Sequence, residues 1–182
     1  MSIVLEPCKK EYINSAKRLY HTAFPAEERA PWIMLRSRAD KRRAELLAAM
    51  DGDSFAGMAY TVTYKDLTYL FYLAVEENRR GQGTGSRIIS ALRERYRGNS
   101  IFLAREQLDR SAENYPQRES RHRFYLSNGF TDMDCRIREG KVIYDVMGTG
   151  RIVLPEEYDA LMLQWSGRLL RLLFRAEMTV YH

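Results

Sequence analysis

Residues Arg80 to Ser86 form a glycine-rich turn whose composition is suited to binding a phosphate group. The turn reads Arg80, Gly81, Gln82, Gly83, Thr84, Gly85 and Ser86. Its glycines free the backbone to turn sharply and let a ligand approach without an intervening Cβ. Apolar residues follow at helical spacing, at Ile88, Ile89, Leu92 and Tyr96, which predicts a helix directly after the turn. Because the first N–H groups of a helix have no intrahelical partner and lie at the positive end of its dipole, the turn predicts an anion site.

Two familiar phosphate-binding loops do not fit these residues. The lysine P-loop ends in Gly-Lys-Ser/Thr, whereas Gly85 is followed by Ser86 and Arg87. The dinucleotide-binding loop needs a third Gly or Ala where this chain has Ser86, although Glu106 lies about the right distance downstream for a ribose contact. What remains is an arginine and two spaced glycines after an uncharged apolar and aromatic run, residues 67–75, which predicts a strand buried on both faces.

A second pattern, at residues 123–130, is typical of a helix that stops at a glycine. It reads Arg123, Phe124, Tyr125, Leu126, Ser127, Asn128, Gly129 and Phe130. Asn128-Gly129 suits a helix end, because glycine readily takes the left-handed conformation found there. Together with the glycine turn, this segment resembles the GNAT superfamily of N-acetyltransferases, which carries an acetyl-CoA loop and a later Phe-Tyr-x-x-x-Gly-Phe segment.

The resemblance covers roughly residues 1–148 and implies both a fold and a reaction. The fold is α/β (mixed α+β), with a central mixed, largely antiparallel sheet flanked by helices. The reaction is transfer of the acetyl group of acetyl-CoA, as co-substrate and without a metal, to a primary amine by direct attack in a ternary complex. The residues implied to bind the cofactor are Leu73, Ala74, Val75, Arg80, Gly81, Gln82, Gly83, Thr84, Gly85 and Ser86. Main-chain N–H groups of the strand that ends at Val75 would polarise the thioester carbonyl.

This reaction needs one group to accept a proton and another to donate one. An alkyl ammonium has a pKa of about 10.4 and must lose its proton before it attacks. The departing thiolate gains from a donor, and the tyrosine that has this role in the family matches Tyr125. Glu106 is the predicted proton acceptor, and an ordered water is the alternative. The other candidates weighed are Glu76, Glu77 and His122. Arg118 stands where the family often has an asparagine, which leaves one pantetheine contact open.

Composition excludes several other classes of protein. The 182 residues, 45% of them apolar, suit one domain, and Cys8 and Cys135 have neither metal-ligand nor disulfide spacing. No run of 18 apolar residues occurs, so we expect a cytoplasmic protein that does not bind membranes. The net charge of +5 is spread along the chain, with its densest run at residues 36–43, so no nucleic-acid partner is expected. The alternatives are a non-catalytic acyl-CoA-binding module and a basic nucleic-acid-binding protein.

The remaining elements follow from periodicity, turn residues and the resemblance. Strands are expected at residues 3–6, 44–50, 54–64, 101–106, 131–137 and 142–147, and helices at 9–24, from Pro31, and from Pro116. For residues 44–50 propensity favours a helix and the resemblance a strand, and we follow the resemblance. Phe24, Trp32 and Arg36 could line the acceptor site. The amine itself, whether polyamine, antibiotic, amino acid, peptide N-terminus or lysine, stays open.

Residues 149–182 are expected to form a C-terminal helical extension of the same domain. A helix from Pro155 to about Ala176 would bury a row made up of Leu161, Trp165, Leu169 and Leu172, either on its own domain or across a homodimer. A basic helix lying on a membrane surface is the alternative.

Overall fold

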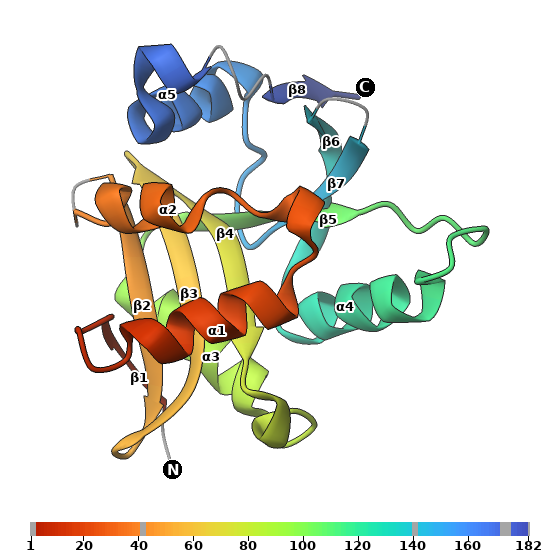
Figure 1. Ribbon diagram of the computed structural model, residues 1–182. Coiled ribbons are helices and arrows are strands. Elements are labelled where there is room, and N and C mark those ends of the chain that lie inside the picture. The colour runs from red at the N-terminus through yellow and green to blue at the C-terminus, as the bar shows by residue number, and fades with distance from the viewer. Residues whose placement is uncertain (1–2, 41–42, 140–141, 172–175, 182) are drawn as a thin grey trace. The chain divides into compact units, whose positions relative to one another are not determined.

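The computed structural model describes residues 3–40, 43–139, 142–171 and 176–181 (Figure 1). Its elements are β1 (Ile3–Pro7), α1 (Ile13–Ala23), η1 (Ala26–Glu28), α2 (Trp32–Arg38), β2 (Ala44–Asp51), β3 (Ser54–Tyr64), β4 (Leu67–Val75), η2 (Glu77–Arg79), α3 (Thr84–Arg95), β5 (Ser100–Glu106), α4 (Tyr115–Ser127), β6 (Thr131–Glu139), β7 (Val142–Gly148), α5 (Pro155–Arg171) and β8 (Ala176–Val180). Among the described helices, none has both the length and the apolar character that a membrane span requires.

The strands hydrogen-bond in the order β1-β2-β3-β4-β5-β7-β6-β8. Strands β4 and β5 pair in parallel, whereas β1–β2, β2–β3, β5–β7, β6–β7 and β6–β8 are antiparallel. The prediction of a mixed, largely antiparallel sheet with helices is therefore confirmed. The chain folds as two compact units, one of residues up to Thr63 with Leu70–Arg97 and one of Tyr64–Tyr69 with the residues from Gly98 onward.

The first unit contains β2, a strand whose residues would be predicted as a helix from their helix propensity alone. Residues 44–50 are rich in helix formers, yet they form β2, which pairs with β1 on one side and β3 on the other. Nearly all of β2 is buried, so pairing and packing outweigh local helix propensity. Helix α1 crosses in front of β2 and β3 in Figure 1, and α3 lies behind them with Ile88, Ile89 and Leu92 buried.

Gly57 lets β3, β4 and α3 approach one another closely. A Cβ added there would collide with the backbone carbonyl oxygen of Ala74 and lie 3.1 Å from Cδ1 of Ile88. We expect Gly57→Ala to lower the free energy of unfolding by about 2–3 kcal/mol, because a backbone atom cannot move aside cheaply. At Gly148 the added Cβ would collide mainly with the flexible end of Met133 and lie 3.3 Å from the carbonyl oxygen of Ile101, so Gly148→Ala should cost less than Gly57→Ala, about 1 kcal/mol. Urea unfolding of both variants measures the contrast, and equal losses would contradict this explanation.

The second unit packs β5, β6, β7 and β8 with α5. Phe102 stacks on Tyr69 with ring centroids 4.7 Å apart, and Leu161 and Trp165 are 0% and 1% exposed. The predicted burial of Leu161 and Trp165 is confirmed within this unit. The side chain of Leu169 and the whole of Leu172, the other two residues of the predicted row, lie outside the described part of the chain.

The predicted end of the C-terminal helix was wrong. Helix α5 is kinked at Gly167, which has φ 76° and ψ 165°, and it ends at Arg171. Ala176, the expected last residue of the helix, instead begins β8, which pairs antiparallel with β6. Ala176 and Met178 are buried whereas Glu177 and Thr179 are exposed, and this alternation is the period of a strand.

Arg151 ties the loop before α5 to the turn between β3 and β4. It pairs with Asp66 at 3.0 Å and Glu157 at 2.7 Å, and its hydrogen bonds lower the pKa of both carboxyls. Folding depresses the pKa values of both carboxyls. The two ion pairs therefore contribute their full stability to the folded protein above the unfolded-state pKa values, near pH 4. This contribution is lost as the pH falls through the folded-state pKa values. We therefore expect Arg151→Gln to lose less stability than wild type between pH 6 and pH 3. Urea midpoints at the two pH values measure this, and parallel losses would contradict the assignment.

Candidate active site

The glycine turn has the backbone conformation that an anion site requires. Gly83 is the N-cap of α3 with φ 72° and ψ 6°, and Gly81 also has φ 72°. Both angles lie in the left-handed region that favours glycine. Among the described residues, no acceptor takes a hydrogen bond from the backbone N–H groups of residues 81–86, and no side chain caps the helix. These donors are therefore available to an anion at the positive end of α3.

Two arginines fold over this turn. Arg80 donates from Nε to the carbonyl of Val75 at 3.2 Å. Arg87 donates from Nη1 to the carbonyl of Gln82 at 3.2 Å and from Nη2 to Oγ1 of Thr84 at 3.0 Å. Its Nε is buried and, within the described part of the chain, has no hydrogen-bond partner. Arg87 was not predicted as a site residue, although its place in the first turn of α3 was a usable signal.

The predicted strand contribution to the site lies in the same unit as the turn. Leu73, Ala74 and Val75 end β4, and only η2 separates them from Arg80. Ala74 is buried at 5% exposure, whereas Leu73 and Val75 are half-buried. The residues predicted to bind the cofactor therefore form one continuous stretch of strand, turn and helix start.

Tyr125 lies on α4 in the second unit. Its ring packs edge-on against Phe124 at 5.1 Å and Phe130 at 5.5 Å. No hydrogen bond joins the hydroxyl to any residue that the structure describes. Burial raises the pKa of Tyr125 to about 12 against the opposing charge of Arg121, so the phenol keeps its proton at neutral pH. The predicted helix stop is confirmed, since α4 ends at Ser127 and Gly129 has φ 76°.

Glu106 ends β5 and is held by side chains of α4. Its Oε1 lies 2.8 Å from Nη2 of Arg118 and its Oε2 lies 2.5 Å from Nη2 of Arg121. Asn114 also donates to Oε1 at 3.3 Å, and the Glu106 side chain is 13% exposed. Arg118, which stands where the family often has asparagine, thus has a partner of its own. To serve as a proton acceptor, Glu106 would have to break one of these ion pairs so that its carboxylate could contact the substrate amine.

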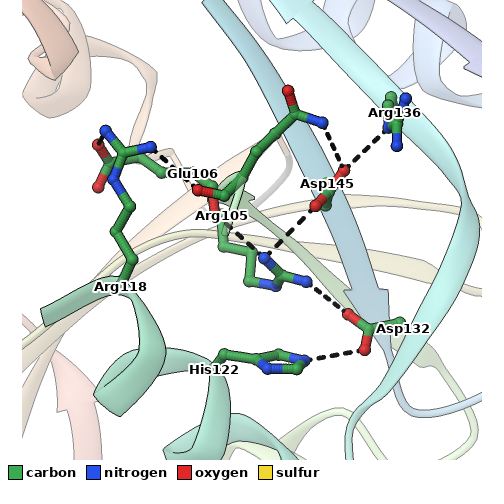
Figure 2. Close-up of polar contacts among 8 residues, drawn as sticks. Arg105, Glu106, Arg118, His122, Asp132, Arg136 and Asp145 are labelled. Atoms are coloured by element: carbon green, nitrogen blue, oxygen red, sulfur yellow. Dashed lines mark hydrogen bonds and ion pairs between the residues drawn. The ribbon is translucent and has the colours of Figure 1, made fainter. Parts of the chain in front are cut away.

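Figure 2 shows a second group of charges beside Glu106, which we call the Arg105 cluster. Its members are Arg105, His122, Asp132, Arg136 and Asp145. Arg105, 9% exposed, lies 2.8 Å from Asp132 and 3.5 Å from Asp145. Nε2 of His122 lies 2.8 Å from Oδ2 of Asp132, and Arg136 lies 3.0 Å from Asp145. The cluster joins α4 to β5, β6 and β7.

The other residues weighed from sequence lie elsewhere. Glu76 pairs with Arg18 at 3.2 Å in the first unit. Trp32 and Phe24 each pack against Tyr20, at 5.5 Å and 5.6 Å, and both are half-buried. Arg36 instead lines a cavity of about 230 Å³ together with Pro7, Cys8, Lys10, Ile13, Ala39, Glu45 and Leu46. Phe24 and Trp32 are thus brought together, whereas Arg36 lines a separate cavity.

Comparison with solved structures finds the same fold in acetyltransferases. A GNAT-family protein from Bacteroides thetaiotaomicron matches with a TM-score of 0.71 and 21% identity over 93% of this chain and 97% of that one. An aminoglycoside 6'-N-acetyltransferase bound to coenzyme A matches with a TM-score of 0.63 and 18% identity over 84% and 99%. A Bacillus subtilis acetyltransferase in complex with CoA matches with a TM-score of 0.58 and 14% identity over 82% and 99%.

Comparison with curated protein sequences found no significant match. A family model described as an acetyltransferase (GNAT) domain matches residues 42–132, half of the 182-residue chain. This stretch includes the strand that ends at Val75, the glycine turn, Glu106 and Tyr125. The chain therefore belongs to the GNAT family of acetyltransferases.

Proposed function

We propose that this protein transfers the acetyl group of acetyl-CoA to a primary amine by direct attack in a ternary complex. The observation that carries the proposal is that the N–H groups of residues 81–86, at the start of α3, donate to none of the described residues in a chain of the GNAT family. Two similar structures are described as complexes with coenzyme A, which supports an acyl-CoA as the ligand.

The residues of the turn fit the phosphates of such a ligand. The N–H groups from Gly81 to Ser86 would donate hydrogen bonds to the pyrophosphate, because they donate to no other described group. Arg80 and Arg87 add positive charge, and the buried Nε–H of Arg87 donates to none of the described residues. Main-chain N–H groups from Leu73 to Val75 would stabilise negative charge on the thioester oxygen.

Tyr125 would donate its proton to the departing sulfur. Its phenol is protonated at neutral pH, and none of the described residues forms a hydrogen bond with the hydroxyl. A phenol is a better acid than the alcohol of serine or threonine, and its pKa lies above that of a thiol, so the proton moves only as negative charge grows on sulfur.

The test is release of free thiol from acetyl-CoA in the presence of a panel of amines. The panel contains a polyamine, an aminoglycoside, amino acids, a peptide N-terminus and a lysine peptide. We expect thiol release that saturates in one class of amine and exceeds release without amine by at least about tenfold. CoA binding without any amine-dependent thiol release would favour a non-catalytic acyl-CoA-binding module. Salt-dependent binding of DNA or RNA without an effect of CoA would favour a nucleic-acid-binding protein.

A further inference from the structure

The protected residues of α4 form a stripe that contains both Tyr125 and His122. Tyr115, Arg118, Glu119, His122 and Tyr125 are half-buried at helical spacing on one face, Phe124 is half-buried on another, and Arg121 and Arg123 are exposed. Residues three apart on a helix have Cβ atoms about 5–6 Å apart. His122 therefore lies one turn before the tyrosine that we propose as the proton donor, on the same face of the helix.

The partners of His122 define which nitrogen carries its proton. Burial alone would raise the pKa of the Asp132 carboxyl, but hydrogen bonds from Arg105 and His122 outweigh it and lower that pKa. An ionised carboxylate can only accept a hydrogen bond, so Nε2 of His122 must be the donor across their 2.8 Å contact. In the neutral ring, Nδ1 then carries the lone pair. Within the described part of the chain, no residue hydrogen-bonds to Nδ1.

The carboxylate beside His122 is itself held by neighbouring strands. Asp132 from β6 contacts the ring, and Arg105 from β5 contacts the far side of Asp132 at 2.8 Å. Asp145 from β7 forms an ion pair with the other terminal nitrogen of Arg105, with 3.5 Å between Oδ2 and Nη1. Arg105 therefore holds the Asp132 carboxylate against the ring, which fixes the orientation of His122. By contrast, both oxygens of Glu106 are occupied by arginines.

We propose that His122 accepts the proton of the acceptor amine at Nδ1, with Asp132 as the residue that positions its ring. This inference rests on the proposed acetyl transfer. The ammonium gives one proton to Nδ1, and the neutral nitrogen forms a bond to the acetyl carbon as the carbon–sulfur bond breaks. Tyr125 protonates the sulfur and regains a proton from the new amide nitrogen. His122 releases its proton to solvent, so one proton leaves per turnover.

The test compares wild type with His122→Gln on two acceptors of matched shape. One is the best alkylamine of the panel, protonated at pH 7, and the other is its fluorinated analogue, largely neutral at that pH. We expect His122→Gln to lower kcat by about 10²-fold with the alkylamine, the low end for a lost general base. With the neutral analogue the loss should be less than about threefold, because no proton has to be removed before attack. The dissociation constant for CoA should not change.

Two further variants separate proton transfer from a structural role. Asp132→Asn removes the negative charge beside the ring, so the acidic limb of the pH–rate profile should move to lower pH, because a neutral neighbour favours the imidazolium less. His21→Gln, at an exposed histidine of α1, is the matched control and should leave both the rate and the profile unchanged.

The outcomes distinguish this inference from the proposed function. Equal losses with both acceptors, or an unmoved pH profile in Asp132→Asn, would overturn the role of His122. If Glu106→Gln rather than His122→Gln shows the loss confined to the protonated amine, Glu106 is the proton acceptor and the inference is wrong. Failure of the wild-type chain to acetylate any amine would overturn both.

Discussion

Gly83→Val is expected to abolish the rise in melting temperature that CoA gives the wild-type protein. A ligand at 100 times its dissociation constant stabilises the folded state by about 2.7 kcal/mol. For a chain of this size that corresponds to about 5–10 °C in melting temperature. Gly83 has φ 72°, which a β-branched residue takes only under strain. The new side chain would also stand among the N–H groups that we propose to hold the pyrophosphate.

The backbone strain needs its own control, which the hairpin glycine Gly52 provides. Gly52 has φ 60°, and a Cβ added there would meet nothing within 4 Å. Gly52→Val should therefore lower the melting temperature of the free protein in a similar way but keep the full shift with CoA. A folded Gly83→Val protein whose CoA shift equals that of wild type would remove the turn from the binding site.

Tyr125→Phe is expected to lower kcat by about 10²-fold while the dissociation constant for CoA changes little. The substitution keeps the ring and its edge-on contacts with Phe124 and Phe130, and it deletes only the hydroxyl. A loss in kcat without a loss in ground-state binding is the signature of an interaction made in the transition state. The rate must be measured with an amine for which chemistry, not product release, limits turnover.

The alternative role of Tyr125 is simple packing, and it makes a different prediction. If Tyr125 only packs, the Tyr125→Phe protein would be slightly less stable than wild type and would keep the wild-type kcat. Tyr64→Phe, which removes the hydroxyl of a half-buried tyrosine elsewhere in the chain, should leave kcat unchanged and serves as the control. A kcat for Tyr125→Phe within about threefold of wild type would reject proton donation.

Features formed by neighbouring residues could be predicted from the sequence. Local backbone geometry determines the left-handed conformation of Gly81 and Gly83 and the helix end before Gly129. Glycine is the residue favoured at such positions, so its presence in the sequence predicts them. Strand β2 could be predicted only through the family resemblance. Its residues favour a helix in isolation, and only its pairing with β1 and β3 makes them a strand.

Features formed by distant residues were missed. Strand β8 pairs with β6, from which β7 and α5 separate it along the chain. Its alternation of buried and exposed residues is too short to distinguish it from the end of a helix. The Arg105 cluster draws its members from β5, α4, β6 and β7. No period or motif in the chain joins Arg105 to Asp132 or Asp145, so the arginine that organises the cluster could not be recognised before the fold was known.

The most direct test of acetyl transfer is to identify and count the products of one reaction. The protein is incubated with acetyl-CoA that carries a ¹³C-labelled acetyl group and with the best amine of the panel. Mass spectrometry then measures labelled amide while a thiol reagent measures free CoA. We predict labelled N-acetyl amine and free thiol in a one-to-one ratio, both absent without protein. Thiol release without labelled amide, or CoA binding with neither product for any amine, would contradict the assignment as an amine acetyltransferase.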